Sequence, residues 1–149
     1  MDTLTAPTSS RAPVWFWAAA SLGLAWNVFG IVQYLGTAGT DAAGFEASGL
    51  TAEQAQVMAA APAWLTAAFA IGVFGGVIGC IGLLLRRRWS KLVLGLSLVA
   101  YVLLWIGDAI VGIFAALGLP QVIILTMVVA IAGALFVLAR AATRNGMLR

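Results

Sequence analysis

Four long apolar segments decide what this sequence can fold into, and they cover roughly residues 14–35, 63–85, 92–114 and 119–139. Each has about the 20 residues that an α-helix needs to cross ~30 Å of hydrocarbon at 1.5 Å per residue. The chain has only eight basic and five acidic residues, too few to cover the surface of a soluble domain of 149 residues. The sequence therefore predicts an all-α integral membrane protein, a single domain of residues 1–149 with four transmembrane helices.

The first apolar segment has an alternative interpretation as a cleaved signal peptide, because small residues follow it at positions 37–44 (TAGTDAAG). Only Arg11 precedes it, however, and the segment is about twice as long as the apolar region of a typical signal peptide. We therefore expect it to be retained as the first spanning helix.

The basic residues predict the orientation of the chain. If the N-terminus is cytoplasmic, all eight bases lie on the cytoplasmic side, whereas the loop at 36–62 faces out with three acids and no base. This distribution follows the positive-inside rule, so we expect both termini in the cytoplasm. Seven of the bases are arginine in an Ala/Gly-rich chain, which is typical of GC-rich bacterial genes, and the predicted location is the bacterial inner membrane. The bases are Arg11, Arg86, Arg87, Arg88, Lys91, Arg140, Arg144 and Arg149.

The connections are short except for the loop at 36–62. Within it, Thr51 and Gln54 have the spacing of a helix capping box, which predicts a short helix across the outer face. The basic loop at 86–91 is long enough only to turn the chain and contact lipid headgroups, so we expect the lipid bilayer as a partner and no nucleic acid. Residues 1–13 and 143–149 are predicted to be short tails.

Small residues follow one face of the second segment, where Ala68, Gly72, Gly75, Gly79 and Gly82 are spaced by four, three, four and three residues. In the first segment, Gly23 and Gly30 share a face with Asn27 and Tyr34. Small residues allow helices in lipid to approach closely, so both faces predict helix contacts. Packing within the bundle, a homodimer interface and a flexing transport helix all remain open. Gly76 lies on a neighbouring face, where we expect a larger side chain to be tolerated better.

Asp108 is the one acidic residue inside an apolar segment (WIGDAIVG, 105–112). Counted from the predicted end of its helix, it lies about six residues, or ~9 Å, below the outer surface. The same count places Asn27 and Thr126 at nearly this depth, with no basic residue in reach. An ionisable residue in a span indicates a functional site, although a proton carrier, a substrate ligand and a structural hydrogen-bonding group all remain open. The predicted substrate-binding residues are Asp108, Asn27, Thr126, Tyr34, Gln33 and Trp105.

The residue inventory excludes several kinds of site. The chain has no histidine, which excludes histidine-based catalysis, haem ligation by histidine and imidazole metal sites, and its single cysteine excludes an internal disulfide. One intramembrane aspartate gives little chemistry for catalysis. We therefore expect no enzyme activity, no cofactor and no metal.

The segment PAWLTAAFAIGVFGGVIGCIGLLLRRRWS (62–90), with AWN (25–27) and Gly30 before it, resembles a family of small bacterial four-helix membrane proteins that carry the name "sugar transporter". The resemblance implies the same order of spans and the transport of small solutes such as sugars, without assigning a role to any residue. Four helices are too few for two rocking repeats, so a transporter of this size is expected to be a homo-oligomer. The alternative is a non-transporting membrane protein that packs against partners through its glycine-rich faces.

Overall fold

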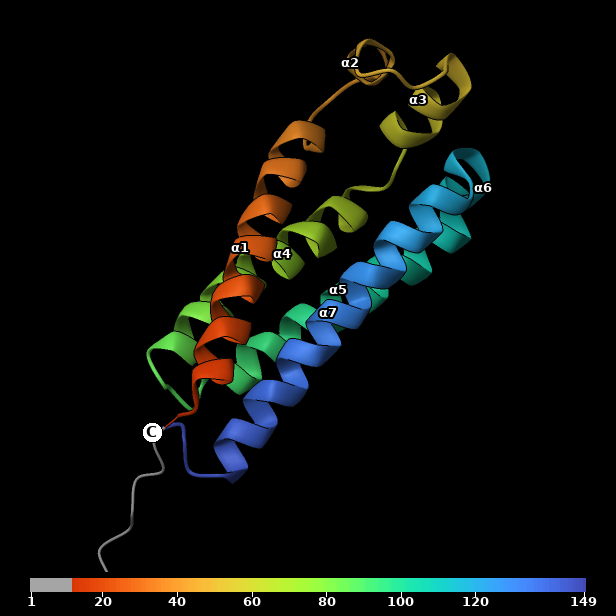
Figure 1. Cartoon of the computed structure of the whole chain (residues 1–149). Helices are drawn as coiled ribbons and strands as arrows, with labels where there is room; N and C mark the ends of the chain where they lie inside the picture. The colour runs from red at the N-terminus through yellow and green to blue at the C-terminus, as the bar shows by residue number, and fades with distance from the viewer. Residues whose placement is uncertain (1–11) are drawn as a thin grey trace, which may run out of the picture.

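The computed structural model describes residues 12–149, and every regular element in that range is a helix (Figure 1). Four of the helices have at least 22 residues and are apolar enough to cross a membrane. Since 22 residues extend about 33 Å, each is long enough to span the hydrocarbon. The prediction of an all-α, multi-pass membrane protein is therefore confirmed. These spanning helices are α1 (Val14–Thr37), α4 (Ala63–Leu84), α5 (Ser90–Val111) and α7 (Leu119–Arg144).

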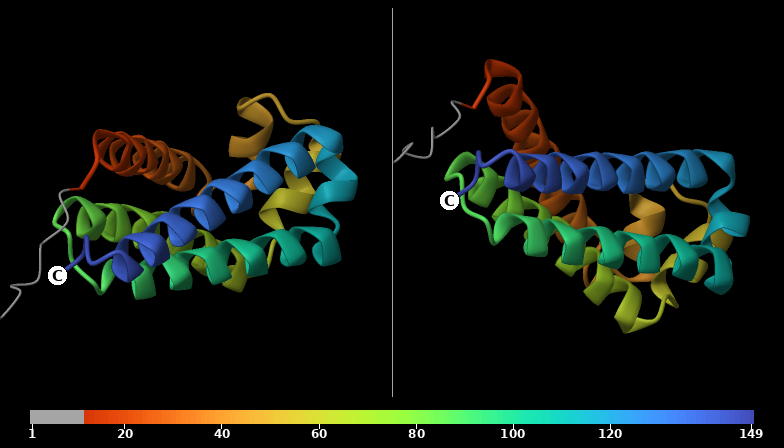
Figure 2. Two further views of the ribbon diagram at one scale, coloured as in Figure 1. Left: turned by 60° about the horizontal axis from the view of Figure 1, so that its bottom comes forward. Right: turned by 90° about the horizontal axis from the view of Figure 1, so that it is seen from below.

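The spanning helices pack in the order α1, α4, α5 and α7, and each runs antiparallel to the next. α5 and α7 lie side by side over most of their length, whereas α1 crosses them obliquely (Figure 2). We call the end that holds the C-terminus the basic end and the opposite end the loop end. α1 meets α7 over far fewer residues than it meets α4, so the seam between α1 and α7 is the least closed side of the bundle.

The third spanning helix ends earlier than the sequence predicted. α5 stops at Val111 because Gly112 has a φ of 89°, a left-handed conformation that glycine adopts without steric cost. The chain then forms the short helix α6 (Ile113–Leu117) before α7 begins. The end of the third span is therefore three residues before the predicted position, 114.

The stripe of small residues on α4 lies against α5. Gly72, Gly79 and Gly82 are buried, and Ala68 is only 7% exposed. A Cβ added to any of the four glycines would meet atoms of α5 or of the turn before it, most closely at Gly72, Gly79 and Gly82. That Cβ would lie 2.6 Å from the Tyr101 ring at Gly72, 3.3 Å from Ser97 Cβ at Gly75, 2.5 Å from Leu94 Cγ at Gly79 and 2.8 Å from Ser90 Cβ at Gly82.

Gly76 lies on the other side of α4, where α1 packs. It is buried, and an added Cβ would overlap the Oδ1 atom of Asn27 and lie 2.9 Å from its Nδ2 atom. The expectation that Gly76 tolerates a larger side chain better than Gly75 and Gly79 was wrong. α4 lies between two helices, so glycines are needed on two of its faces.

The small residues of α1 lie where this helix meets its neighbours. A Cβ added to Gly23 would lie 2.5 Å from the side chain of Leu135 on α7 and 3.3 Å from the Cys80 sulfur on α4. One added to Gly30 would lie 2.9 Å from Val73 on α4. The face of α1 predicted from spacing is therefore the face that enters the bundle.

Two short helices, α2 (Ala42–Ala47) and α3 (Ala52–Ala59), cover the loop end. The predicted capping box of α3 is confirmed, because Gln54 N donates to Thr51 Oγ1 (3.3 Å) and Thr51 N donates to Gln54 Oε1 (3.1 Å). Gln54 Nε2 also donates to Ala116 O in α6 at 3.1 Å. This bond ties α3 to α6, the short helix between α5 and α7.

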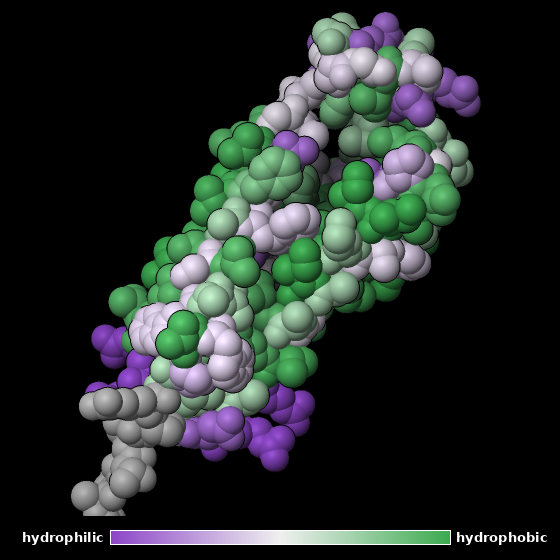
Figure 3. All heavy atoms as spheres, viewed as in Figure 1, coloured by the Kyte–Doolittle hydropathy of each residue, from purple (hydrophilic) through white to green (hydrophobic). Residues whose placement is uncertain are grey.

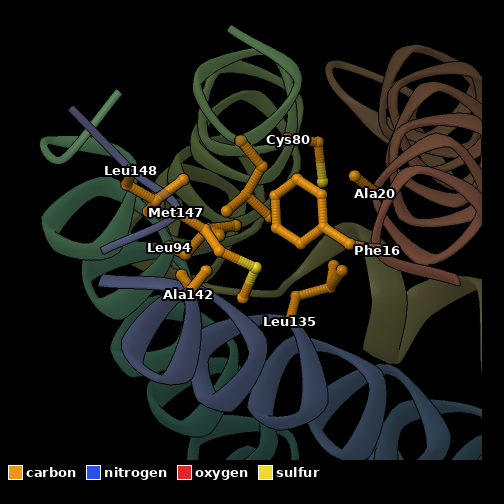
Figure 4. Close-up of a cluster of buried hydrophobic side chains, with 10 residues drawn as sticks. Phe16, Ala20, Cys80, Leu94, Leu135, Ala142, Met147 and Leu148 are labelled. Carbon is orange, nitrogen blue, oxygen red and sulfur yellow. The ribbon is translucent and has the colours of Figure 1, made fainter. Parts of the chain in front are cut away.

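The C-terminal residues belong to the core of the basic end. α7 continues to Arg144, and Gly146, with a φ of 66°, turns the chain back under the bundle. Met147 and Leu148 are 5% and 1% exposed, in a cluster with Phe16 and Cys80 (Figure 4). The expectation of a short tail at 143–149 was wrong, because the left-handed turn at the glycine redirects two apolar side chains inward. The other predicted tail falls almost wholly on residues 1–11, outside the described range.

On the face of the bundle seen in Figure 3, the middle is largely apolar and the most hydrophilic side chains gather at the two ends. Four tryptophans near the ends of the spanning helices are exposed, as residues at a membrane–water interface are. A surface of this kind fits a surrounding of lipid. These tryptophans are Trp15, Trp17, Trp64 and Trp89.

Candidate functional site

The six candidate side chains do not form one pocket. Four of them take part in three separate hydrogen bonds that lie at different places on the bundle, and each bond joins two helices. The bonds link Asn27 to Tyr101, Trp105 to Thr126, and Asp108 to Gln121.

Asn27 lies in the interior, where α1, α4 and α5 meet. It is 3% exposed, its Nδ2 atom donates to Gly23 O (2.8 Å), and its Oδ1 atom accepts a long hydrogen bond from the Tyr101 hydroxyl (3.4 Å). The Ser97 hydroxyl lies on the same face of α5 and donates to Gly72 O (2.6 Å). Because Ser97 and Tyr101 are also buried, this group supplies three uncharged polar side chains near the middle of the spans.

Two glycines make room for this group. Gly76 leaves space for the Asn27 amide, and Gly72 leaves space for the Tyr101 ring. The signal in the sequence was Gly76, which lies outside the stripe of small residues and faces α1.

A narrow cleft adjoins Asn27 and is lined by all four spanning helices. The gaps between its side chains are too small to hold a water molecule. We call it the mid-span cleft. Its lining includes Trp26, Asn27, Gly76, Ser97, Tyr101 and Ala132.

Asp108 joins the end of α5 to the start of α7. It is 4% exposed, and its Oδ2 atom accepts a hydrogen bond from Gln121 Nε2 (3.1 Å). It lies three residues, about 4.5 Å, before the end of α5 at Val111, closer to the surface than the sequence indicated. Gln121 is in the first turn of α7, where the helix dipole also favours a negative charge. The hydrogen bond from Gln121 and the start of α7 therefore stabilise the carboxyl group of Asp108 without a basic partner.

Trp105 and Thr126 form a pair on a more exposed side of α5 and α7. The indole Nε1 donates to Thr126 Oγ1 (3.0 Å), and Thr126 is exposed. The Trp105 ring packs edge-on against Phe114 with ring centroids 5.4 Å apart. This pair therefore satisfies an indole N–H at the bundle surface and lies outside the mid-span cleft.

The two remaining candidates are apart from both groups. The Tyr34 ring contacts Phe69 and Phe74 edge-on, with centroids 5.6 and 5.9 Å apart, and Gln33 is exposed. Tyr34 therefore packs within the apolar contact of α1 with α4.

The expected closeness of Asn27 and Asp108 was wrong because the spans do not start at one level. Asn27 lies against Gly76, and the adjacent Gly75 lies against Ser97. From Ser97 to Asp108 there are eleven residues of helix, or about 16 Å. Counting residues from each predicted end could not reveal this offset.

Among residues 12–149, no three His, Cys, Asp or Glu side chains come together as a metal site would require. The polar groups that the structure brings together across helices are therefore hydrogen-bonding groups. Comparison of the chain with protein-family models, with curated proteins and with solved structures found no match.

Proposed function

We propose that this chain is a small membrane transporter that binds a small polar solute, such as a sugar, in the mid-span cleft. The observation that carries this proposal is a cleft lined by all four spanning helices, with three uncharged polar side chains on its wall near the middle of the spans. Transporters commonly bind their substrates at this depth, between helices that move relative to one another. The family resemblance of the sequence points to the same class of function.

The chemistry of the cleft favours a neutral, hydroxyl-rich solute. The Asn27 amide and the hydroxyls of Ser97 and Tyr101 both donate and accept hydrogen bonds, as sugar hydroxyls do. Trp26 adds an aromatic side chain to the wall. No charged residue lines the cleft, so a fixed charge on the solute would have no partner there.

Access to the cleft requires α1 and α7 to separate. The two helices touch toward the basic end, where Gly23 meets Leu135. Figure 3 shows a hollow between them toward the loop end. Because the cleft is too narrow for water as it stands, binding must widen this seam. A second copy of the chain would supply the counterpart against which α1 moves, and we therefore propose a homo-oligomer.

Uptake into proteoliposomes tests this proposal with a panel of labelled sugars, with and without a proton gradient. Tyr101→Phe keeps the ring and removes one hydroxyl, and we expect it to reduce uptake of the accepted sugar about tenfold. Thr126→Val, on the exposed side of α7, and Asp108→Asn, which keeps a hydrogen-bonding group beside Gln121, should leave uptake unchanged. Loss of uptake in folded Asp108→Asn with normal uptake in Tyr101→Phe would move the site to Asp108.

A second candidate function is a non-transporting membrane protein that packs against partners through its helix faces. The observation in its favour is that, in the part of the chain that the structure describes, every buried side-chain nitrogen and oxygen already has a hydrogen-bond partner. The polar groups of the mid-span cleft are hydrogen-bonded within the chain, and the cleft has no room for water, so they do not require a solute as a partner. Absence of uptake for every sugar in the panel, from protein shown to be folded and inserted, would favour this candidate.

We infer that the basic end faces the cytoplasm of a bacterial inner membrane, with both termini on that side. The acids Asp41, Glu46 and Glu53 lie at the loop end, and the seven bases within residues 12–149 lie at the other end. The positive-inside rule places the basic end in the cytoplasm.

An impermeant thiol reagent tests the orientation. A cysteine in place of the exposed Ala43 should react when the reagent is added to spheroplasts, whereas one in place of Arg87 should react only after lysis. Cys80 is buried and should not react with the reagent in spheroplasts or after lysis. The reverse order of labelling would overturn the orientation.

A further inference from the structure

The basic end concentrates positive charge in one layer. Seven of the eight bases of the chain lie there, and the acids described in residues 12–149 are in the loop at the opposite end or, for Asp108, near it. The bases come from two segments, residues 86–91 at the turn between α4 and α5 and the start of α5, and the C-terminal part of the chain. They are Arg86, Arg87, Arg88, Lys91, Arg140, Arg144 and Arg149.

Backbone pairing fixes these two segments to each other. Arg149 N donates to Arg86 O (2.6 Å), and Arg88 N donates to Arg149 O (3.0 Å). Arg86 has a φ of 56°, a left-handed conformation that costs a non-glycine residue energy and that this pairing helps to hold. The turn and the C-terminal residues therefore form one rigid platform.

The platform also directs two arginine side chains. Arg86 Nε donates to Met147 O (2.7 Å), and Arg88 Nε donates to Leu148 O (3.3 Å). A carbonyl oxygen restrains a guanidinium group without neutralising its charge, and a guanidinium group has five N–H donors in a planar fork that matches phosphate oxygens. Arg87 and Arg88 are exposed, so their charge faces the surroundings of the bundle.

Lipid-facing residues lie directly beside the bases. Leu85 and Leu92 are 62% and 72% exposed on either side of the turn, and between them Trp89 is 42% exposed. Exposed leucines belong in hydrocarbon and an exposed tryptophan at its boundary, which places the adjacent bases at the level of the lipid headgroups.

We propose that the platform is a binding surface for the phosphate groups of anionic lipids, with Arg87, Arg88 and Lys91 beside Trp89 as its centre. Charge complementarity selects an anionic headgroup, and the neighbouring exposed leucines select a lipid over a free anion in solution. This surface is independent of the mid-span cleft, so it holds whether or not the chain transports a solute.

Thermal unfolding of the full chain in detergent tests the proposal, with phosphatidylglycerol, phosphatidylcholine or inorganic phosphate added at equal concentration. We expect phosphatidylglycerol to raise Tm by about 5 °C and the other two to have little effect. Arg87→Gln with Lys91→Gln should remove at least half of that shift, since neither side chain is bonded to the C-terminal carbonyls. Gln56→Glu with Ala43→Glu is the matched control, because it lowers the net charge equally at exposed positions of the loop end.

Three results would overturn the proposal. Equal stabilisation by phosphatidylcholine would show that the lipid charge is irrelevant, and equal stabilisation by inorganic phosphate would show that no lipid is required. If the rise in Tm caused by phosphatidylglycerol falls equally in the matched control, the effect depends on the net charge of the chain and not on this surface.

Discussion

Gly76→Ala is expected to destabilise the bundle by about 2 kcal/mol, although alanine is the better helix former by roughly 1 kcal/mol. The added methyl group would overlap Asn27 Oδ1, and this side chain is buried and bonded to both Gly23 and Tyr101. Asn27 can move away only by breaking one of these hydrogen bonds or by forcing α1 away from α4. The free energy of unfolding in mixed micelles, followed by circular dichroism, measures the effect.

Gly133→Ala is the matched control. Gly133 lies within the spanning helix α7, and nothing lies within 4 Å of the position of an added Cβ. The substitution should be neutral or stabilising. Equal losses at both positions would indicate a general intolerance of alanine and contradict the contact between Gly76 and Asn27.

A double-mutant cycle isolates that contact. Asn27→Ala removes the atoms that the new methyl group would strike, so Gly76→Ala should cost less in the Asn27→Ala background. A coupling of about 1–2 kcal/mol is expected for residues in direct contact. Strict additivity would mean that the two side chains do not meet.

The sequence was sufficient to predict the spans and the capping box of α3 because these depend on local patterns. Twenty apolar residues must cross the hydrocarbon as a helix wherever they lie in the bundle. Thr51 and Gln54 cap α3 through bonds that reach only three residues. The faces of small residues on α1 and α4 also follow from helical periodicity alone.

The polar groups could not be placed from the sequence because their partners depend on register between helices. Asn27 meets Gly76 and Tyr101 only because α1 is offset along α4, and no local pattern encodes that offset. The depth of Asp108 depended on where its helix ends, which the left-handed turn at Gly112 decides. The C-terminal segment was predicted to be a short tail because no periodic pattern continues through it, and the turn at Gly146 that carries it under the bundle is not encoded in such a pattern.

The second large effect is expected from the C-terminal segment, with the only cysteine of the chain as the reporter. Cys80 is 0% exposed in the same cluster as Met147 and Leu148. Ending the chain at Asn145 removes both apolar side chains, whose burial contributes about 3 kcal/mol in total. If local opening of the basic end controls access to the thiol, that loss raises the labelling rate of Cys80 about a hundredfold.

Leu148→Ala tests the same contact in a chain of full length, should the shortened chain fail to fold. Removal of a fully buried leucine side chain costs about 2 kcal/mol or more, so labelling of Cys80 by N-ethylmaleimide should accelerate at least tenfold. Leu92→Ala makes the same chemical change at the same end of the bundle, but Leu92 is 72% exposed to lipid, and Cys80 should stay protected. Protection of Cys80 that is unchanged in folded Leu148→Ala would show that the cluster is closed without the C-terminal segment. Faster labelling confined to Leu148→Ala and to the shortened chain would establish these residues as the closure of the basic end.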